Sequence, residues 1–233
     1  MNPRIWEKAQ KSEKSWWKKR INSLNLDFYR EFAENIINDI KDYLPLSSKT
    51  HILEIGSGAA GNLTFIETDY RFAIDPLEMF YANVPRFQKI RDKNVFYLAA
   101  MGEALPFKNG SFDLVIIDNV LDHCLSPETV IQETARVTKD GGIIHLKQNI
   151  FSSYGKSVRM LVHRLGLDRK HPFAFTENDI ERILIKNQLT LLTKQRWGFF
   201  RSLYYAFSFG EGTSRGSAIL LAMRDQIKMV LKK

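Results

Sequence analysis

The chain has 233 residues, 44% of them hydrophobic, so it is long enough to bury one substantial core, and a single α/β domain with additions is expected. Its one cysteine, Cys124, excludes an internal disulfide and a paired-cysteine metal or redox site, which favours a reducing, cytoplasmic compartment. The formal net charge is +8, and the sequence predicts neither a signal peptide nor a membrane-spanning stretch.

The N-terminal region predicts helices. Apolar residues recur at steps of three and four over residues 4–44, and Pro45 ends this pattern. We therefore interpret residues 1–48 as a helical cap, followed by a main domain over residues 49–233.

From Thr50 onward, short apolar bursts alternate with helical stretches, which is typical of a parallel sheet built from βα units. The sequence predicts strands at 51–56, 71–75, 95–99, 112–118 and 142–148. It predicts helices at about 60–68, 77–91 and 127–138. Ser126 and Pro127 supply the last of these helices with an N-cap and a first-turn proline.

The segment after the fifth strand is expected to form a helical lid at about 151–187. It contains a predicted helix at about 153–166 and a second helix that starts at the capping-box sequence Thr176-x-x-Asp179 and runs to Lys186. Two final apolar runs, 189–195 and 217–223, are expected to pair antiparallel at the sheet edge.

The most informative segment is a strand that runs into the glycine sequence Gly56-x-Gly58-x-x-Gly61. Such a loop is typical of a dinucleotide site, with Asp75 as the ribose-binding residue. Glu54, however, lies two residues before the first glycine, and its repulsion of a pyrophosphate 4 to 6 Å away is about 3–4 kcal/mol. A ligand with an ammonium and a sulfonium group, such as S-adenosylmethionine, is attracted by the same carboxylate.

Four motifs, in order and spacing, resemble those of the class I S-adenosylmethionine-dependent methyltransferases, in particular the small-molecule and lipid methyltransferases of type 11. They are Glu54-x-Gly56-x-Gly58, Asp75-Pro76, the segment from Gly102-Glu103 through Ser111-Phe112-Asp113-Leu114-Val115, and Ala135 to Gly142. The resemblance implies an α/β fold, with a Rossmann-like, mostly parallel sheet of seven strands, an antiparallel last strand and helices on both faces.

The resemblance also implies roles for individual residues. Gly56, Ser57 and Gly58 approach the methionyl part of the cofactor, and Glu54 reaches its ammonium group through water. Asp75 accepts hydrogen bonds from both ribose hydroxyls. The adenine ring is expected against Pro76 or Leu77 and near Gly102 and Glu103, although Met101 stands where the family usually has an acidic residue. The predicted cofactor site also includes Gly61 and, at the end of the fourth strand, Asp118 and Asn119.

Two histidines are candidate general bases. His123 follows Asp122 at the mouth of the expected crevice, and His171 lies in the insertion that could reach over it. The alternative for His123 is a loop-packing histidine, and an amine acceptor needs no base. No spacing of carboxylates and histidines resembles a metal site, so none is predicted.

Basic residues are concentrated in the flanks, because residues 1–20 carry seven basic and two acidic side chains whereas residues 51–150 carry nine and thirteen. This distribution suits an anionic acceptor or peripheral contact with a membrane, or it reflects lysines on solvated helices. We expect a methyltransferase acting on a small-molecule, lipid-linked or sugar-linked acceptor. The alternatives are an NAD(P)-dependent oxidoreductase, a nucleic-acid methyltransferase, which the absence of an Asn/Asp-Pro-Pro-aromatic turn disfavours, and a non-catalytic nucleotide-binding module.

Overall fold

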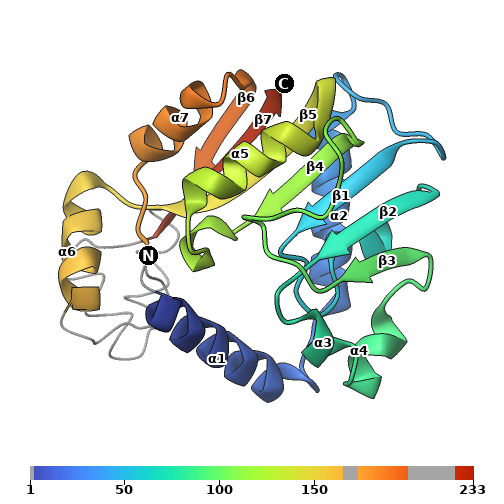
Figure 1. The fold of residues 1–233 in the computed structure, drawn as a ribbon, viewed down its shortest axis with the longest axis horizontal. Coiled ribbons are helices and arrows are strands. Elements are labelled where there is room, and N and C mark those ends of the chain that lie inside the picture. Colours follow the sequence, from blue (N-terminus) through green and yellow to red (C-terminus); the bar gives the residue numbers. More distant parts are fainter. Residues whose placement is uncertain (1–2, 165–172, 199–223) are drawn as a thin grey trace.

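A computed structural model describes residues 3–164, 173–198 and 224–233, and these residues form one seven-stranded sheet (Figure 1). The strands are β1 (His51–Ile55), β2 (Tyr70–Ile74), β3 (Val95–Leu98), β4 (Phe112–Asp118), β5 (Thr138–Ile150), β6 (Thr190–Trp197) and β7 (Asp225–Lys232). Their order is β3-β2-β1-β4-β5-β7-β6, and β7 runs in the direction opposite to that of the other six strands. The predicted Rossmann-like, mostly parallel sheet with an antiparallel last strand is confirmed.

The last strand lies later in the chain than the sequence pattern predicted. It comprises Asp225–Lys232, whereas the predicted run at 217–223 lies outside the described residues. Ile227 and Met229 face a buried core, while the alternate positions Gln226 and Lys228 line a cavity on the other face. Because this strand is polar on one face, it lacks the continuous apolar run that marks the other central strands.

The N-terminal region forms two helices, α1 (Pro3–Arg20) and α2 (Leu26–Ile40), in place of one continuous helical run. Asn25 begins the second helix, because its side chain accepts hydrogen bonds from the backbone N–H groups of Asp27 and Phe28. The boundary at residue 48 and the interpretation as a separate cap stay predictions.

Two of the predicted crossover helices are shorter than expected. The region 77–91 forms α3 (Glu78–Tyr81) and α4 (Pro85–Ile90), since Pro85 starts a new helix. The region 60–68 forms only the 3₁₀ turn η1 (Asn62–Phe65). Arg71 Nη1 donates to the carbonyl groups of Leu63 and Ile66, at 3.0 and 2.9 Å, and so takes acceptors that a longer helix would use.

The remaining helices agree with the sequence. Helix α5 (Pro127–Val137) has Ser126 as its N-cap, and α7 (Glu177–Lys186) begins with the predicted capping box of Thr176 and Asp179. Helix α6 (Ser153–Arg164) stands apart from the sheet in Figure 1. Within the ranges that the structure describes, no helix is both long and apolar enough to cross a membrane.

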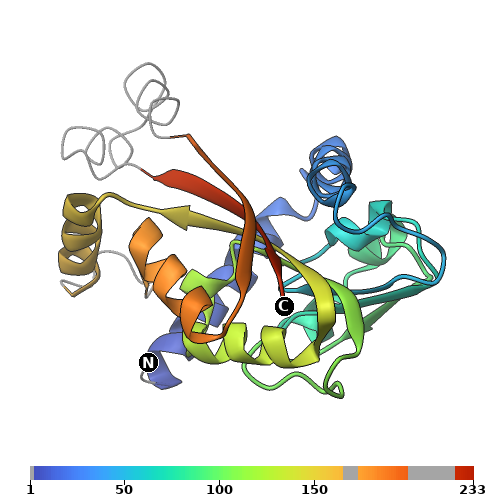
Figure 2. The same cartoon turned by 90° about the horizontal axis from the view of Figure 1, so that it is seen from above.

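Helices cover both faces of the sheet, as predicted. On one face, Ala33, Ile36 and Ile40 of α2 pack in a core with Ile52 and Leu114. On the other, side chains of α5 and α7 pack against the alternate residues of β1, β4, β5 and β7. Figure 2 shows α2 on one side and α5 and α7 on the other. A third cluster joins Trp17 of α1 to Tyr81 and Phe87, which places α1 near the carboxyl ends of the parallel strands.

Candidate functional site

A cavity of about 200 Å³ opens at the carboxyl ends of β1, β2 and β4, where ligands bind in open α/β sheets. Helix α1 forms one wall. The lining residues are Trp6, Gln10, Glu13, Trp17, Ile55, Gly56, Gly58, Ile74, Asp75, Pro76, Leu77, Tyr81, Ala100, Gly102, Glu103, Asp118, Asn119, Val120, His123 and Cys124.

The glycine loop after β1 is held close to its neighbours. Gly56 and Gly58 have φ angles of 74° and 61°, a region that favours glycine. A Cβ atom on Gly56 would overlap Val120 Cγ2, and one on Gly58 would lie 2.8 Å from the Trp17 ring. The first glycine is therefore required by the loop that follows β4, and the second by the docking of α1.

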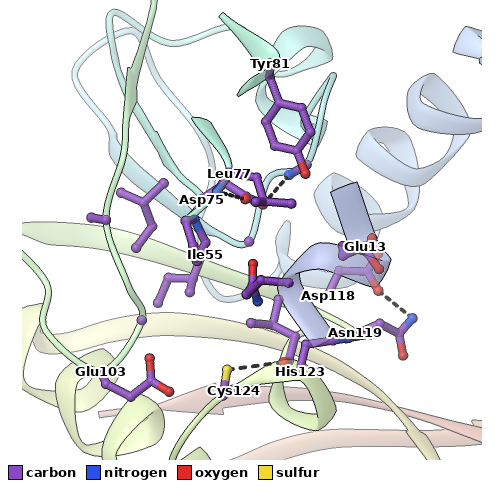
Figure 3. Close-up of a pocket in the computed structure, with 18 of the residues that line it drawn as sticks. Glu13, Ile55, Asp75, Leu77, Tyr81, Glu103, Asp118, Asn119, His123 and Cys124 are labelled. Carbon is purple, nitrogen blue, oxygen red and sulfur yellow. Dashed lines mark hydrogen bonds between the residues drawn. The ribbon is translucent and has the colours of Figure 1, made fainter. Parts of the chain in front are cut away.

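Asp75 lies at the end of β2 with its carboxylate in the cavity (Figure 3). Oδ1 accepts a hydrogen bond from the backbone N–H of Leu77 at 2.8 Å, and Oδ2 accepts one from Gly58 at 3.0 Å. Burial raises the pKa of Asp75 to about 6, although these two N–H donors oppose the shift. Each oxygen keeps a lone pair with which to accept a ligand hydroxyl.

Glu54 does not line the cavity. Its carboxylate lies behind the glycine loop, where it accepts hydrogen bonds from the backbone N–H groups of Asn62 and Leu63 and from the Asn62 side chain. Burial raises its pKa to about 7. A Cβ atom on Gly61 would lie 3.0 Å from Glu54 Oε2, so this third glycine gives the carboxylate its space. The predicted contact of Glu54 with a ligand ammonium through water stays a prediction.

The cavity carries strong negative charge in a chain of net charge +8. Four carboxylates line it, those of Glu13, Asp75, Glu103 and Asp118, whereas no lysine or arginine is among the lining residues. In Figure 3, Glu103 lies on one side of the cavity, and Glu13 and Asp118 lie on the other. This set of carboxylates attracts a cationic ligand and repels a pyrophosphate.

Besides Asp75, two of these carboxylates have protein partners. Glu103 Oε1 accepts from the backbone N–H groups of Leu125 and Ser126 at 2.6 and 3.1 Å, so it also fixes the loop before α5. Asp118 lies 3.4 Å from the ammonium of Lys147. Burial raises the pKa of Asp118, and Lys147 opposes that shift.

The two histidine predictions have different outcomes. His123 lines the cavity, and its Nε2 lies 3.9 Å from Asp122 Oδ2. His171 lies outside the described residues. Cys124 also faces the cavity, and burial raises the pKa of its thiol, which keeps it protonated at neutral pH. In the described part of the chain, no three metal-binding side chains come together as a metal site would require.

The structure brings most of the predicted cofactor residues together. The predicted residues that line the cavity are Gly56, Gly58, Asp75, Pro76, Leu77, Gly102, Glu103, Asp118 and Asn119, whereas Glu54, Ser57, Gly61 and Met101 do not line it. Those that sequence reasoning missed include Gln10 and Glu13 of α1. A signal for them was present in the sequence. Gln10 and Glu13 lie between Trp6 and Trp17 at helical spacing, so they are polar residues on the face of the helix that carries the tryptophans.

The sequence is similar to known methyltransferases. A family model described as a methyltransferase domain matches residues 53–146. The chain is 29% identical over 182 residues to a malonyl-[acyl-carrier protein] O-methyltransferase of Marinomonas sp. (strain MWYL1), covering 74% of this chain and 65% of that protein. It is 28% identical over 131 residues to the thiol S-methyltransferase TMT1B of Homo sapiens, covering 52% of this chain and 51% of that protein. The chain thus spans between half and two thirds of these relatives.

Solved structures share the fold. The geranyl diphosphate C-methyltransferase from Streptomyces coelicolor A3(2) superposes with a TM-score of 0.65 at 13% identity, covering 85% of this chain and 78% of that one. The YcgJ protein from Bacillus subtilis gives a TM-score of 0.63 at 14% identity, covering 86% and 97%. Together with the motifs and the strand order, these findings show a methyltransferase domain over residues 53–146 in a chain with the methyltransferase fold, as the resemblance to class I S-adenosylmethionine-dependent methyltransferases predicts.

Proposed function

We propose that this protein transfers a methyl group from S-adenosylmethionine to a small-molecule, lipid-linked or sugar-linked acceptor. The observation that carries the proposal is the lining of the cavity, with Asp75 at the end of β2 and three further carboxylates but no lysine or arginine. S-adenosylmethionine supplies an activated methyl group on a sulfonium and, with its ammonium group, fits such a lining. The same lining disfavours the phosphates of NAD(P), the cofactor of the oxidoreductase alternative.

The residues of this chain would bind, align and exclude water. Asp75 would accept hydrogen bonds from ribose hydroxyls, and Gly102 and Glu103 would border the adenine. Methyl transfer by in-line displacement depends mainly on alignment and on a dry site. Trp6 and Trp17 of α1 line the cavity, so within the predicted cap 1–48 it is α1 that is proposed to cover the site, whereas α2 packs on the sheet. Within the predicted lid at 151–187, α6 is proposed to lie on the acceptor side, because α7 packs against the sheet.

The acceptor class is informed by relatives. The names of two of them specify a malonyl group on an acyl carrier protein and a thiol, and neither name specifies a nucleic acid. We therefore infer that the present chain also methylates an acceptor other than a nucleic acid.

The cofactor can be tested by thermal and chemical unfolding. S-adenosylmethionine or S-adenosylhomocysteine at about 100 times its dissociation constant is expected to raise the free energy of unfolding by about 2.7 kcal/mol, whereas NADH at the same concentration is expected to have no effect. Stabilisation by NADH alone would overturn the proposal. Stabilisation by the adenosyl compounds without methylation of any acceptor in a panel would favour a binding module.

His123 is expected to act as the general base if the acceptor is a hydroxyl. Its side chain lies in the cavity beside Asp122, and a neutral imidazole within reach of the hydroxyl contributes about a hundredfold. His123→Gln should therefore lower turnover by about that factor and leave the dissociation constant of S-adenosylhomocysteine unchanged. His171→Gln, assayed beside it, tests the second candidate, and His163→Gln on α6 is the control. Near-normal turnover in all three would indicate catalysis by alignment alone, as for an amine acceptor.

A further inference from the structure

A second cavity, of about 510 Å³, lies between α2 and the edge of the sheet formed by β5, β7 and β6. We call it the β7 cavity. Its lining residues are Phe28, Glu31, Phe32, Asn35, Ile36, Asp39, His145, Lys147, Gln195, Trp197, Gln226 and Lys228. None of them lines the proposed cofactor cavity, so this is a separate site.

Lys147 is the most unusual residue of the β7 cavity, because it is a buried cation with few partners. It is 5% exposed, and its Nζ lies 3.4 Å from Asp118 Oδ1 and 3.5 Å from the centroid of the Phe32 ring. A charge-assisted hydrogen bond is usually 2.7–2.9 Å long. No other carboxylate forms an ion pair with Lys147 within the described residues. An ammonium group has three N–H donors, and Asp118 is the one carboxylate that accepts from this group among the described residues.

A second ammonium group lies next to the first. Lys228 of β7 is directly opposite Lys147 of β5 in the antiparallel register, and both face the β7 cavity. Like charges directly opposite destabilise a sheet. The two lysines also interact electrostatically. Burial lowers the pKa of Lys147, and the nearby charge of Lys228 lowers it further.

The acidic residues of the β7 cavity do not supply Lys147 with a further acceptor. Asp39 Oδ1 accepts from Lys228 at 2.6 Å, and Asp39 Oδ2 is 2.9 Å from His145 Nε2, so both of its oxygens are engaged. Glu31 is exposed and forms no ion pair with any described residue. The space beside Lys147 is therefore open to an additional anion.

We propose that the β7 cavity is a second ligand site, which binds an organic anion by placing its carboxylate or phosphate between Lys147 and Lys228. The aromatic side chains of Phe28, Phe32 and Trp197 suit a ligand with an apolar or aromatic body. Phe28 and Trp197 are 53% and 39% exposed, which is unusual for large aromatic residues and leaves them available for contact. Gln195, directly opposite Lys228 in register, adds an amide donor.

The test uses benzoate and phenyl phosphate as probes and benzamide as an uncharged control of the same shape. The indole N–H signal of Trp197, assigned by its loss in Trp197→Phe, is followed by NMR during each titration at constant ionic strength. A saturable shift is expected with both anions and not with benzamide, and the tighter of the two anions identifies the preferred group. Lys147→Met should weaken binding of the anions at least tenfold, while Lys232→Met, at an exposed lysine of the neighbouring strand β7, should bind them as the wild type does.

Equal shifts with benzoate and benzamide, or unchanged benzoate binding in Lys147→Met, would overturn the site. If Lys147→Met does not fold, Lys228→Gln is expected to lose the anion response, and Lys228→Arg, which keeps the charge, is expected to retain it. Binding of S-adenosylhomocysteine by the same variants is measured in parallel. If the wild type does not bind S-adenosylhomocysteine, the proposed function is contradicted, whereas the result with the anions is unaffected.

Discussion

Replacement of Trp17 by alanine is expected to lower the free energy of unfolding by about 3–5 kcal/mol, the usual cost of truncating a large buried aromatic residue. Trp17 is 7% exposed and makes edge-to-face contacts with Tyr81 and Phe87, at centroid distances of 5.6 and 6.1 Å. It also packs against Gly58 of the glycine loop. The same substitution should therefore weaken S-adenosylhomocysteine binding. Chemical unfolding and calorimetry measure the two effects.

The matched control is Lys18→Ala, an exposed position on the same helix, which should change neither quantity. If Trp17→Ala lowers stability but leaves cofactor affinity intact, α1 contributes to folding and is not a wall of the cofactor site. Unchanged stability would show that α1 does not dock on the α3 and α4 region as described.

The central fold was predictable because its signals are local. The strands β1, β4 and β5 are buried on both faces, and such strands read as apolar runs regardless of what packs on them. Asp75 and the glycine loop could be placed for the same reason, since the carboxyl ends of parallel strands share one edge of the sheet. The position of β7 was not predictable from apolar runs, because Lys228 and Gln226 face a cavity.

Long-range contacts decided the features that the sequence did not reveal. Arg71 ends the 3₁₀ turn after the glycine loop from a position on the next strand. The carboxylate of Glu54 turns away from the cavity because Asn62 and Leu63 supply its hydrogen bonds. Glu13 enters the site through the docking of a helix far from it in sequence. Such contacts depend on tertiary packing, and of these three only that of Glu13 has a periodic signal in the chain, its helical spacing between Trp6 and Trp17.

The acid-base behaviour of the cavity follows from the burial of Asp75. Its pKa of about 6 in the folded protein exceeds the ordinary value of 3.8, so the native state holds the proton more tightly than the unfolded chain does. The stability of the ligand-free protein should therefore fall as the pH rises from about 4 through 6, and this contribution should be absent in Asp75→Asn. The ionised form accepts ribose hydroxyls, so cofactor affinity should change in the opposite direction, rising over the same range.

Asp75→Ala is expected to weaken S-adenosylhomocysteine binding by about 2–4 kcal/mol, because two ribose hydroxyls lose a charged acceptor. Calorimetry at pH 8, on a variant shown to be folded, measures the loss. Asp69→Ala, at an exposed position just before β2, is the control and should bind as the wild type does. Asp75→Asn should also bind weakly, and its affinity should not vary between pH 5 and 7.

A loss of binding free energy below about half a kcal/mol in Asp75→Ala, small beside the cost of one charged hydrogen bond, would mean that Asp75 does not touch the ribose. A pH dependence that persists in Asp75→Asn would instead implicate Glu54, whose pKa of about 7 lies in the same range.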